Sequence, residues 1–526
     1  MAARTVTGHR AVPRRFEVIA LGLILALAAY LRLAHNGDNP GWFSDEATHL
    51  DIAYNLLRGR VQYLALNRST LLVARLPLFD LLLAGSLRLW DGGMVTLRTL
   101  TGLMGVLSVG LLYGVVRRTQ AGEDVVLALL SALTLAVYPS AVLYSRFGFS
   151  YNLLALVVLV VLLGLWEYLR TSKRGWLALA ATAAGLGGVS DLFAFTLVPP
   201  LILVILIRRW RDVPLALLLA GLPAALYAGL MIACAPDAFW FDVRYTVSRV
   251  SGIPLGAQII TLANNFTALF AEDWWITVGV IGLLALRPAR LSRLGLLLFL
   301  VPLVSVGRAV ALFSLSFYYM IPLFPLVALG VASLLRHGVP LLAAHVRGGL
   351  SALAASLGVD FLRGRFLSLV VAAVVLLLVA MPFATPVVAV FNGVRYGFVT
   401  SIDTFLISPA DARKAAAYVN AHTDPGDLVI ASPPVGWLLE ANTANAEMVI
   451  AATGTPTVHL PGDIPADRFA FEPWLSVADL VVVDNLWRDW AAPSMPEARR
   501  MMDMVAEEWP LVYQAGQIEV YRGPER

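Results

Sequence analysis

The stretch GWFSDEATHLDIAYNLLRG, Gly41 to Gly59, places two adjacent carboxylates, Asp45 and Glu46, shortly after an apolar run of membrane-spanning length. That run, Phe16–Leu33, is preceded by basic residues, and no small-residue cleavage site follows it. We therefore interpret it as an uncleaved first transmembrane helix and not as a signal peptide. The two acids then lie where the chain leaves the bilayer, and this position needs an explanation.

The composition is that of a membrane protein. Of the 526 residues, 59% are hydrophobic and 14% are charged, whereas a soluble domain carries about 25% charged residues. The net charge of +4 gives no reason to expect nucleic acid as a partner. The single cysteine, Cys234, excludes an internal disulfide framework and a thiolate metal cluster. The basic residues are nearly all arginine, a bias typical of GC-rich bacterial genomes.

Apolar runs elsewhere in the chain predict about eleven transmembrane helices. They lie near 16–34, 97–116, 125–144, 152–169, 176–190, 192–208, 214–234, 274–287, 294–307, 317–335 and 367–390. If the N-terminus is cytoplasmic, every cytoplasmic connection is rich in arginine, as in RRTQAGED, RTSKRGW, RRWRD and RPARLSR. This alternation follows the positive-inside rule, which predicts a multi-pass protein of the plasma (inner) membrane with its N-terminus in the cytoplasm.

The same alternation leaves no room for a span in RLPLFDLLLAGSLRLW, Arg75 to Trp90. We predict that this segment and Glu46–Arg58 form helices along the outer membrane interface, within a first external loop of residues 35–96. The alternative is that residues 75–90 cross the bilayer and that another span is miscounted.

The last part of the chain has a soluble composition. Helical patterns such as ADARKAAAYVNAH alternate there with strand-like segments such as DLVIAS and ADLVVVDNL. The predicted fold is thus an all-α multi-pass membrane domain, 1–390, followed by a soluble α/β domain, 391–526. By the parity of the spans, this second domain lies outside the cytoplasm.

The acid pair has two interpretations. SDEA is an ordinary helix start, with Ser44 as N-cap and two acids in the first turn, where the helix dipole favours them. That interpretation does not explain why the helix starts at the membrane surface. A carboxylate there suits sugar transfer from a lipid phosphate, because the acceptor hydroxyl needs a base. The leaving phosphate needs no acid, and the reacting carbon gains cationic character.

Successive residues of a helix point about 100° apart, so Asp45 and Glu46 cannot share one task. We predict Asp45 as the base and Glu46 as an orienting or hydrogen-bonding partner. The departing phosphate needs cations, for which arginine is best suited. The external candidates are Arg75, Arg146, Arg244, Arg249 and Arg308. The alternative is that these arginines only anchor the protein at the interface by snorkelling.

Several motifs of the membrane half resemble the GT-C glycosyltransferases, in the protein O-mannosyltransferase, aminoarabinose transferase and RgtA-like branches. WFSDEATHLDIAYNLLRG resembles their acidic first-loop motif. ARLPLFDLLLAGSLRLW, SRFGFSYNLLALVVLVV and FYYMIPLFPLVALG are similar to later motifs in the same order. The resemblance implies a GT-C fold, a polyprenyl-phosphate sugar donor, inversion of the anomeric centre and a reaction on the outer face. The family's proposed base falls on Asp45.

The chain departs from the family at two places. The family often has His-Pro-Pro or Lys-Pro after the first interface helix, where this chain has Arg75-Leu76-Pro77. Arg75 could replace the missing cation. Many members have an aspartate at the position of Tyr151, so a second acid is absent there. Asp191 and Asp242 are other external acids near a membrane edge, and each could substitute or could only cap a helix.

Metal and ligand sites are less well marked. No HExxH or other strong metal-ligand spacing is present. A carboxylate site could take a divalent cation, but we assign no metal ligand and no cofactor. His49 and Tyr151 join the arginines as substrate-binding candidates, although a position on a helix surface would also account for His49.

Together these observations predict an inverting enzyme that moves a hexosyl or pentosyl group from a polyprenyl phosphate to an extracytoplasmic hydroxyl. The acceptor would be a glycolipid, a cell-envelope glycan or a protein, and the partners would include membrane lipids but no nucleic acid. A transporter or lipid flippase is one alternative, but the chain shows no matched halves and the acid pair lies in a loop. An inactive relative that serves as an assembly partner is the other.

Overall fold

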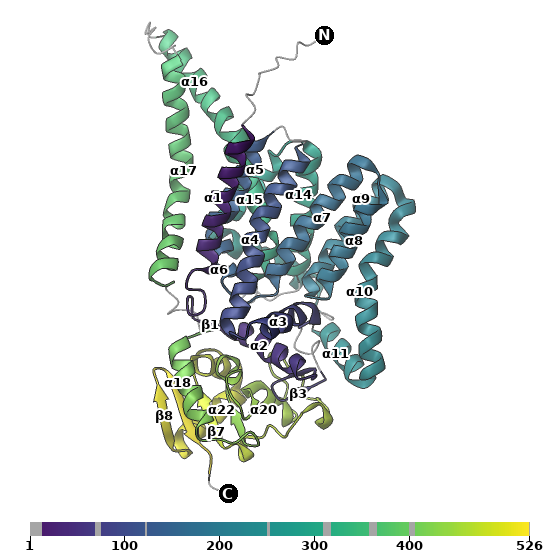
Figure 1. Cartoon of the computed structure of the whole chain (residues 1–526), viewed down its shortest axis with the longest axis vertical. Coiled ribbons are helices and arrows are strands. Elements are labelled where there is room, and N and C mark those ends of the chain that lie inside the picture. Colours follow the sequence, from purple (N-terminus) through teal and green to yellow (C-terminus); the bar gives the residue numbers. More distant parts are fainter. Residues whose placement is uncertain are drawn as a thin grey trace.

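The computed structural model describes residues 13–68, 75–120, 124–249, 253–308, 317–356, 365–398 and 405–524. It consists of a bundle of long helices with a small α/β domain at one end (Figure 1). The first helix, α1 (Arg14–Leu33), begins at the end of the bundle opposite to that domain. The predicted fold class, a helical multi-pass membrane protein with a C-terminal α/β domain, is confirmed.

Helices make up the whole bundle because a segment inside a bilayer must satisfy its own backbone hydrogen bonds. After α1 the bundle contains α4 (Met94–Thr119), α5 (Val125–Val137), α6 (Pro139–Ser145), α7 (Tyr151–Thr171), α8 (Arg174–Gly188), α9 (Val198–Arg209), α10 (Val213–Cys234), α12 (Leu255–Glu272), α13 (Trp274–Leu284), α14 (Ala289–Gly307), α15 (Phe324–Ser333), α16 (Val339–Ser356) and α17 (Arg365–Tyr396). A large apolar core is shared by α4, α5, α7, α8, α13, α14 and α15.

The number of spans differs from the prediction. Among the described residues, seven helical segments are long and apolar enough to cross a membrane, or up to nine if two bent pairs each form one span. We predicted about eleven. The count is lower partly because α9 and α10 fall within one segment, Leu192–Cys234, although α10 runs back alongside α9 (Figure 1). In addition, α8 has only 15 residues.

Two shorter helices, α2 (Ser44–Leu57) and α3 (Pro77–Leu89), lie between the bundle and the C-terminal domain (Figure 1). The first residue of α2 is Ser44, and Phe43 is its N-cap, which corrects the predicted role of Ser44. The cap is stabilised by the Glu46 carboxylate, which accepts a hydrogen bond of 2.9 Å from the backbone N–H of Phe43. With 13 residues, α3 is not among the candidate spans.

The C-terminal domain is built on a five-stranded mixed sheet. Its strand order is β6 (Asn442–Ala444), β5 (Leu428–Ile430), β7 (Leu480–Val483), β9 (Ile518–Arg522) and β8 (Leu511–Ala515). The strands β6, β5 and β7 are parallel, whereas β9 is antiparallel to both β7 and β8. The main helices of this domain are α18 (Pro409–Asn420), α20 (Ala446–Ala452) and α22 (Pro496–Glu508).

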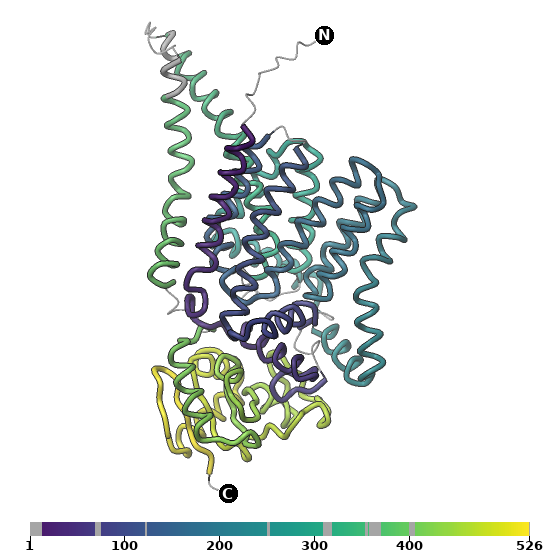
Figure 2. The backbone as a smooth tube through the Cα atoms, viewed as in Figure 1, coloured from purple at the N-terminus to yellow at the C-terminus, as the bar shows by residue number. Residues whose placement is uncertain are grey.

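The C-terminal domain is joined directly to the segment that precedes α2. Strand β1 (Trp42–Phe43) pairs antiparallel with β4 (Leu406–Ile407). The buried Trp42 ring also lies 5.6 Å from the ring of Trp437. Figure 2 shows the green-to-yellow C-terminal domain against the purple first loop. The contact places this domain beside the acid pair.

Candidate active site

Asp45 lies in the first turn of α2 and forms an ion pair with Arg75, which precedes α3. Arg75 Nη2 lies 2.8 Å from Asp45 Oδ1, and 31% of the Asp45 side chain remains exposed. Burial acts to raise the pKa of Asp45, but the Arg75 guanidinium more than offsets it, so the pKa lies below its usual value. Asp45 is therefore an ionised and accessible carboxylate at neutral pH, as a general base must be.

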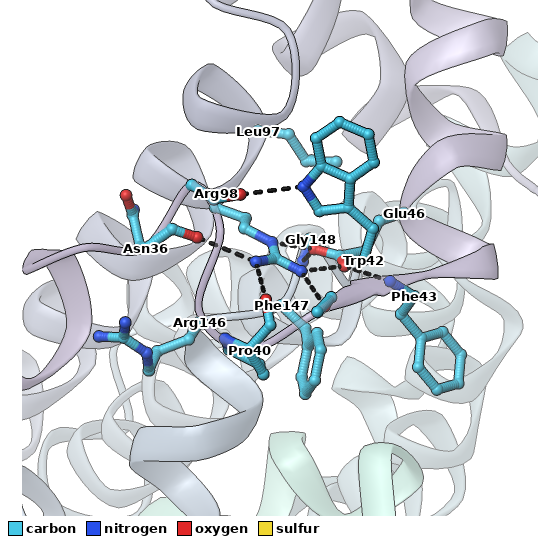
Figure 3. Close-up of polar contacts among 12 residues, drawn as sticks. Asn36, Pro40, Trp42, Phe43, Glu46, Leu97, Arg98, Arg146, Phe147 and Gly148 are labelled. Carbon is cyan, nitrogen blue, oxygen red and sulfur yellow. Dashed lines mark hydrogen bonds and ion pairs between the residues drawn. The ribbon is translucent and has the colours of Figure 1, made fainter. Parts of the chain in front are cut away.

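Glu46 points away from Asp45 and is completely buried. Its carboxylate pairs with Arg98, which donates from Nε at 2.7 Å and from Nη2 at 2.6 Å. The backbone N–H of Gly148 donates to the same carboxylate at 2.6 Å. Figure 3 shows Arg98 between Glu46 and the loop before α2. The other hydrogen bonds of Arg98 go to the backbone carbonyls of Asn36, Pro40 and Gly41.

This arrangement makes Glu46 and Arg98 the anchor of α2. They tie the helix to α4 and to the loop before α7, so they fix the direction in which Asp45 points. Arg98 was not among the predicted site residues. The available signal was a charged residue at the start of an apolar span, where an unpaired charge is unfavourable.

His49 lies one helical turn after Asp45, on the same face of α2. Its Nδ1 is 2.5 Å from Oδ1 of Asp80 in α3, and both side chains are buried. The His49 ring also makes an edge contact with Phe79 at 4.8 Å. His49 therefore joins α2 to α3. It also lowers the pKa of Asp45, less strongly than Arg75 does.

A second acid lies close to Arg75. Asp191 follows α8 and caps the 3₁₀ helix η1 (Leu192–Leu197) by accepting a hydrogen bond of 2.9 Å from the N–H of Phe193. Burial raises the pKa of Asp191, and the Phe193 hydrogen bond, Arg75 and the Tyr151 hydroxyl offset part of that rise. Asp191 is thus near both Arg75 and Tyr151.

Tyr151 opens α7 and is buried. Its ring stacks on Tyr318 with the ring centroids 5.7 Å apart, and it makes an edge contact with Tyr319 at 5.4 Å. These tyrosines belong to the 3₁₀ helix η4 (Phe317–Leu323). Tyr151 therefore lies in an aromatic wall next to Asp191.

Arg146 has backbone partners. Its side chain is completely buried, and it donates hydrogen bonds to the carbonyls of Leu31, Ala34 and Asn39. Its guanidinium also lies 5.6 Å from the centre of the Phe398 ring. These contacts hold the chain between α1 and α2, which explains why a basic residue follows α6.

The remaining predicted arginines contact other parts of the protein. Arg244, on α11 (Pro236–Ser248), donates from Nε to the carbonyl of Trp240 on the same helix. Arg249 lies over the Tyr245 ring at 6.0 Å. Arg308, which follows α14, donates to the Gln258 side chain at 3.1 Å. The structure thus places Arg75 beside Asp45, and the other four predicted arginines have partners of their own.

Asp242, the other external acid, has a structural partner. It pairs with Arg468 of the C-terminal domain at 2.8 Å, and each side chain is only 3% exposed. The pair fastens α11 to that domain. Among the described residues, no group of three or more His, Cys, Asp or Glu side chains is placed to hold a metal ion.

Comparison with known proteins gives two kinds of match. Residues 74–240 match a family model described as dolichyl-phosphate-mannose-protein mannosyltransferase. This region contains Arg75, Tyr151 and Asp191, while Asp45 precedes it. No curated protein sequence matches the chain.

The fold is similar to that of ArnT from Cupriavidus metallidurans bound to undecaprenyl phosphate. The TM-score is 0.62 at 15% sequence identity, over 98% of this chain and 100% of that one. The fold is also similar to that of the oligosaccharyltransferase AglB from Archaeoglobus fulgidus, in complex with an inhibitory peptide and a dolichol-phosphate. There the TM-score is 0.52 at 12% identity, over 93% of this chain and 72% of that one.

Proposed function

We propose that this chain is a membrane glycosyltransferase of the GT-C type, which transfers a sugar from a polyprenyl phosphate to an acceptor hydroxyl outside the cytoplasm. The lipid donor is proposed from the ligands in two proteins of similar fold, undecaprenyl phosphate with ArnT and a dolichol-phosphate with AglB. The observation that carries the proposal is the ion pair of Asp45 and Arg75. It puts an ionised base and a phosphate-binding cation side by side.

Asp45 is the general base of this reaction. It takes the proton of the acceptor hydroxyl while the hydroxyl oxygen attacks the anomeric carbon. The bond from that carbon to the phosphate oxygen breaks, and its electron pair leaves with the lipid phosphate. Because the hydroxyl attacks from the face opposite to the phosphate, one displacement inverts the anomeric centre.

Arg75 holds the donor phosphate. Its Nε is buried and has no hydrogen-bond partner among the described residues, and a guanidinium can bind phosphate through two parallel N–H groups. When the phosphate shares the guanidinium, less of the positive charge acts on Asp45. The pKa of Asp45 then rises, so the carboxylate becomes a stronger base once the donor is bound.

Other residues hold these two in position. The buried Glu46–Arg98 pair fixes the start of α2, and the His49–Asp80 contact fixes α2 against α3. Asp191 adds a second negative charge near Arg75. We assign it the role of keeping the guanidinium in the site when the phosphate competes with Asp45.

The site faces away from the cytoplasm in this proposal. Two features support that orientation. The acids of α2, the helix α3 and the C-terminal domain lie at the same end of the bundle, and α1 begins at the other end (Figure 1). The arginine-rich connections, such as those after α4, α7 and α9, lie at the end where α1 begins.

A turnover assay tests the proposal. The purified protein is reconstituted in nanodiscs with undecaprenyl-phosphate-linked mannose, glucose or aminoarabinose, and free undecaprenyl phosphate is measured over time. We expect one of these donors to be consumed. If no donor is cleaved while intact lipid moves between the leaflets of reconstituted vesicles, the protein is a transporter and the proposal is wrong.

A further inference from the structure

The C-terminal domain carries a polar and aromatic cluster of three residues, His459, Glu447 and Trp490, which we call the His459 cluster. His459 Nδ1 lies 3.0 Å from Glu447 Oε2, and the backbone N–H of His459 donates to Glu447 Oε1, also at 3.0 Å. The His459 ring stacks on Trp490 at a centroid distance of 5.5 Å and an angle of 25°. Glu447 is nearly buried, whereas 51% of the His459 side chain is exposed.

A chain of ring contacts connects this cluster to the start of α2. Trp490 lies 6.0 Å from Phe405, and Phe405 stacks on Phe43 at 5.6 Å. Phe43 is the N-cap of α2, two residues before Asp45. Phe405 directly precedes β4, the strand that pairs with β1. The backbone pairing and the ring contacts therefore connect the His459 cluster to the start of α2, where Asp45 lies. In agreement with this position, His459 is one of the groups that lower the pKa of Asp45.

The contacts of His459 leave one side of the ring available. Its Nδ1 is engaged by Glu447 and one face is covered by Trp490. No partner for Nε2 is found within the described part of the chain, and half of the side chain is exposed. A ring fixed in this way has lost much of its side-chain freedom before any ligand arrives, so a hydrogen bond from Nε2 requires little further ordering.

The chemistry of the cluster suits a carbohydrate. A sugar presents hydroxyl groups, which can donate to or accept from an imidazole nitrogen. It also presents C–H faces, which pack on aromatic rings such as the half-buried Trp490 and Phe405.

We propose that His459 is a positioning residue that binds a hydroxyl group of a carbohydrate acceptor and directs the neighbouring hydroxyl toward Asp45. The C-terminal domain thereby forms the acceptor side of the active site, while the helical bundle holds the lipid donor. This inference rests on the proposed function, since it needs Asp45 to act on an acceptor. It goes further in assigning a class of acceptor and a residue that recognises it.

The test separates transfer to a sugar from transfer to water. The probes are p-nitrophenyl glycosides of mannose, galactose, glucose and N-acetylglucosamine, a peptide rich in serine and threonine, and buffer alone. The donor is the undecaprenyl-phosphate sugar that the wild-type protein consumes. For His459→Ala we expect the KM for the glycoside to rise about tenfold, as for the loss of one hydrogen bond. We expect cleavage of the donor by water to change far less than transfer to the glycoside.

Two further variants separate recognition from a structural effect. His459→Gln keeps a hydrogen-bonding group and should recover most of the affinity for the glycoside. His422→Ala is the matched control, because His422 is also exposed, lies in the same domain and stacks on a ring, that of Tyr418, at 4.1 Å. It should leave the KM for the glycoside at the wild-type value.

The outcomes distinguish this inference from the proposed function. An active protein in which His459→Ala has the wild-type KM for the glycoside overturns the inference and leaves the proposed function intact. Transfer to the peptide and to none of the glycosides also overturns it. If the wild-type protein cleaves no donor at all, the proposed function fails, and the inference fails with it.

Discussion

Arg75 Nη2 lies 2.8 Å from Asp45 Oδ1, so the cation that precedes α3 neutralises the first carboxylate of α2. The pair sits at the end of the helical bundle, next to a soluble domain fastened to the same loop through β1 and β4. A partly exposed ion pair of this kind contributes at most about 1 kcal/mol to stability. Its position and its accessibility point to a role in chemistry.

The pH dependence of donor cleavage should depend on Arg75. Burial acts to raise the pKa of Asp45, and the Arg75 guanidinium is the main cause of its lowered value. In Arg75→Gln the effect of burial remains but the positive charge that opposes it is lost, so the pKa of Asp45 rises. We therefore expect the acidic limb of the pH profile of kcat/KM to move to higher pH in Arg75→Gln. The measurement is donor cleavage in nanodiscs between pH 4 and pH 8.

The control for this variant is Arg88→Gln, since Arg88 is an exposed arginine in α3, the helix that Arg75 precedes. It should keep the wild-type acidic limb. The lowered pKa of Asp45 also affects the stability of the folded protein. Because the folded-state pKa of Asp45 is lowered, the pair stabilises the protein above the usual aspartate pKa, and this contribution disappears as the pH falls through the lowered value. An unmoved limb in Arg75→Gln contradicts the assignment of Asp45 as base.

Removal of one member of the buried Glu46–Arg98 pair should destabilise the protein strongly. Glu46→Ala leaves the completely buried Arg98 without its counterion, which costs about 3–5 kcal/mol. The midpoint of thermal unfolding in detergent, followed by intrinsic fluorescence, should fall markedly. Glu497→Ala removes an exposed ion pair with Arg500 in α22 and should change the midpoint little. A wild-type midpoint in Glu46→Ala would mean that this pair does not anchor α2.

Asp191 and Asp242 should respond differently to the same substitution. Asp191→Asn keeps an acceptor for the Phe193 N–H, since asparagine caps helices as well as aspartate does. It removes only the negative charge near Arg75, so kcat/KM for the donor should fall about tenfold with little change in thermal stability. Asp242→Asn leaves the buried Arg468 without its counterion and should lower thermal stability instead. Unchanged turnover in Asp191→Asn would show that Asp191 is only a helix cap.

The architecture was largely predictable from the sequence. Apolar runs and the alternation of arginine-rich connections indicated the bundle, and alternating helical and strand-like segments indicated the C-terminal domain. The interpretation of residues 75–90 as a short helix outside the spans agrees with α3 and its 13 residues. The eleven predicted spans compare with seven to nine candidate segments among the described residues, partly because α9 and α10, predicted as two spans, fall within the one segment Leu192–Cys234.

The candidate site was predictable only in part. The different partners of Asp45 and Glu46 follow from helical geometry, since adjacent residues point in different directions. The partners of Glu46 and Arg146 were not predictable, because they come from segments about fifty to more than a hundred residues away along the chain. The approach of His459 to the site also depends on tertiary contacts, here the pairing of β1 with β4.

We propose that Asp45 acts as the base for transfer of a sugar from a lipid phosphate. Three proteins are compared in nanodiscs: the wild type, Asp45→Asn and Asp38→Asn, a control in an exposed loop position. For each protein, one assay measures the binding of undecaprenyl phosphate, and a second measures its release from the lipid-linked sugar. We predict that Asp45→Asn binds the lipid as the wild-type protein does but loses about 10²–10⁴-fold in release, while Asp38→Asn keeps both. Wild-type release by Asp45→Asn would contradict the account.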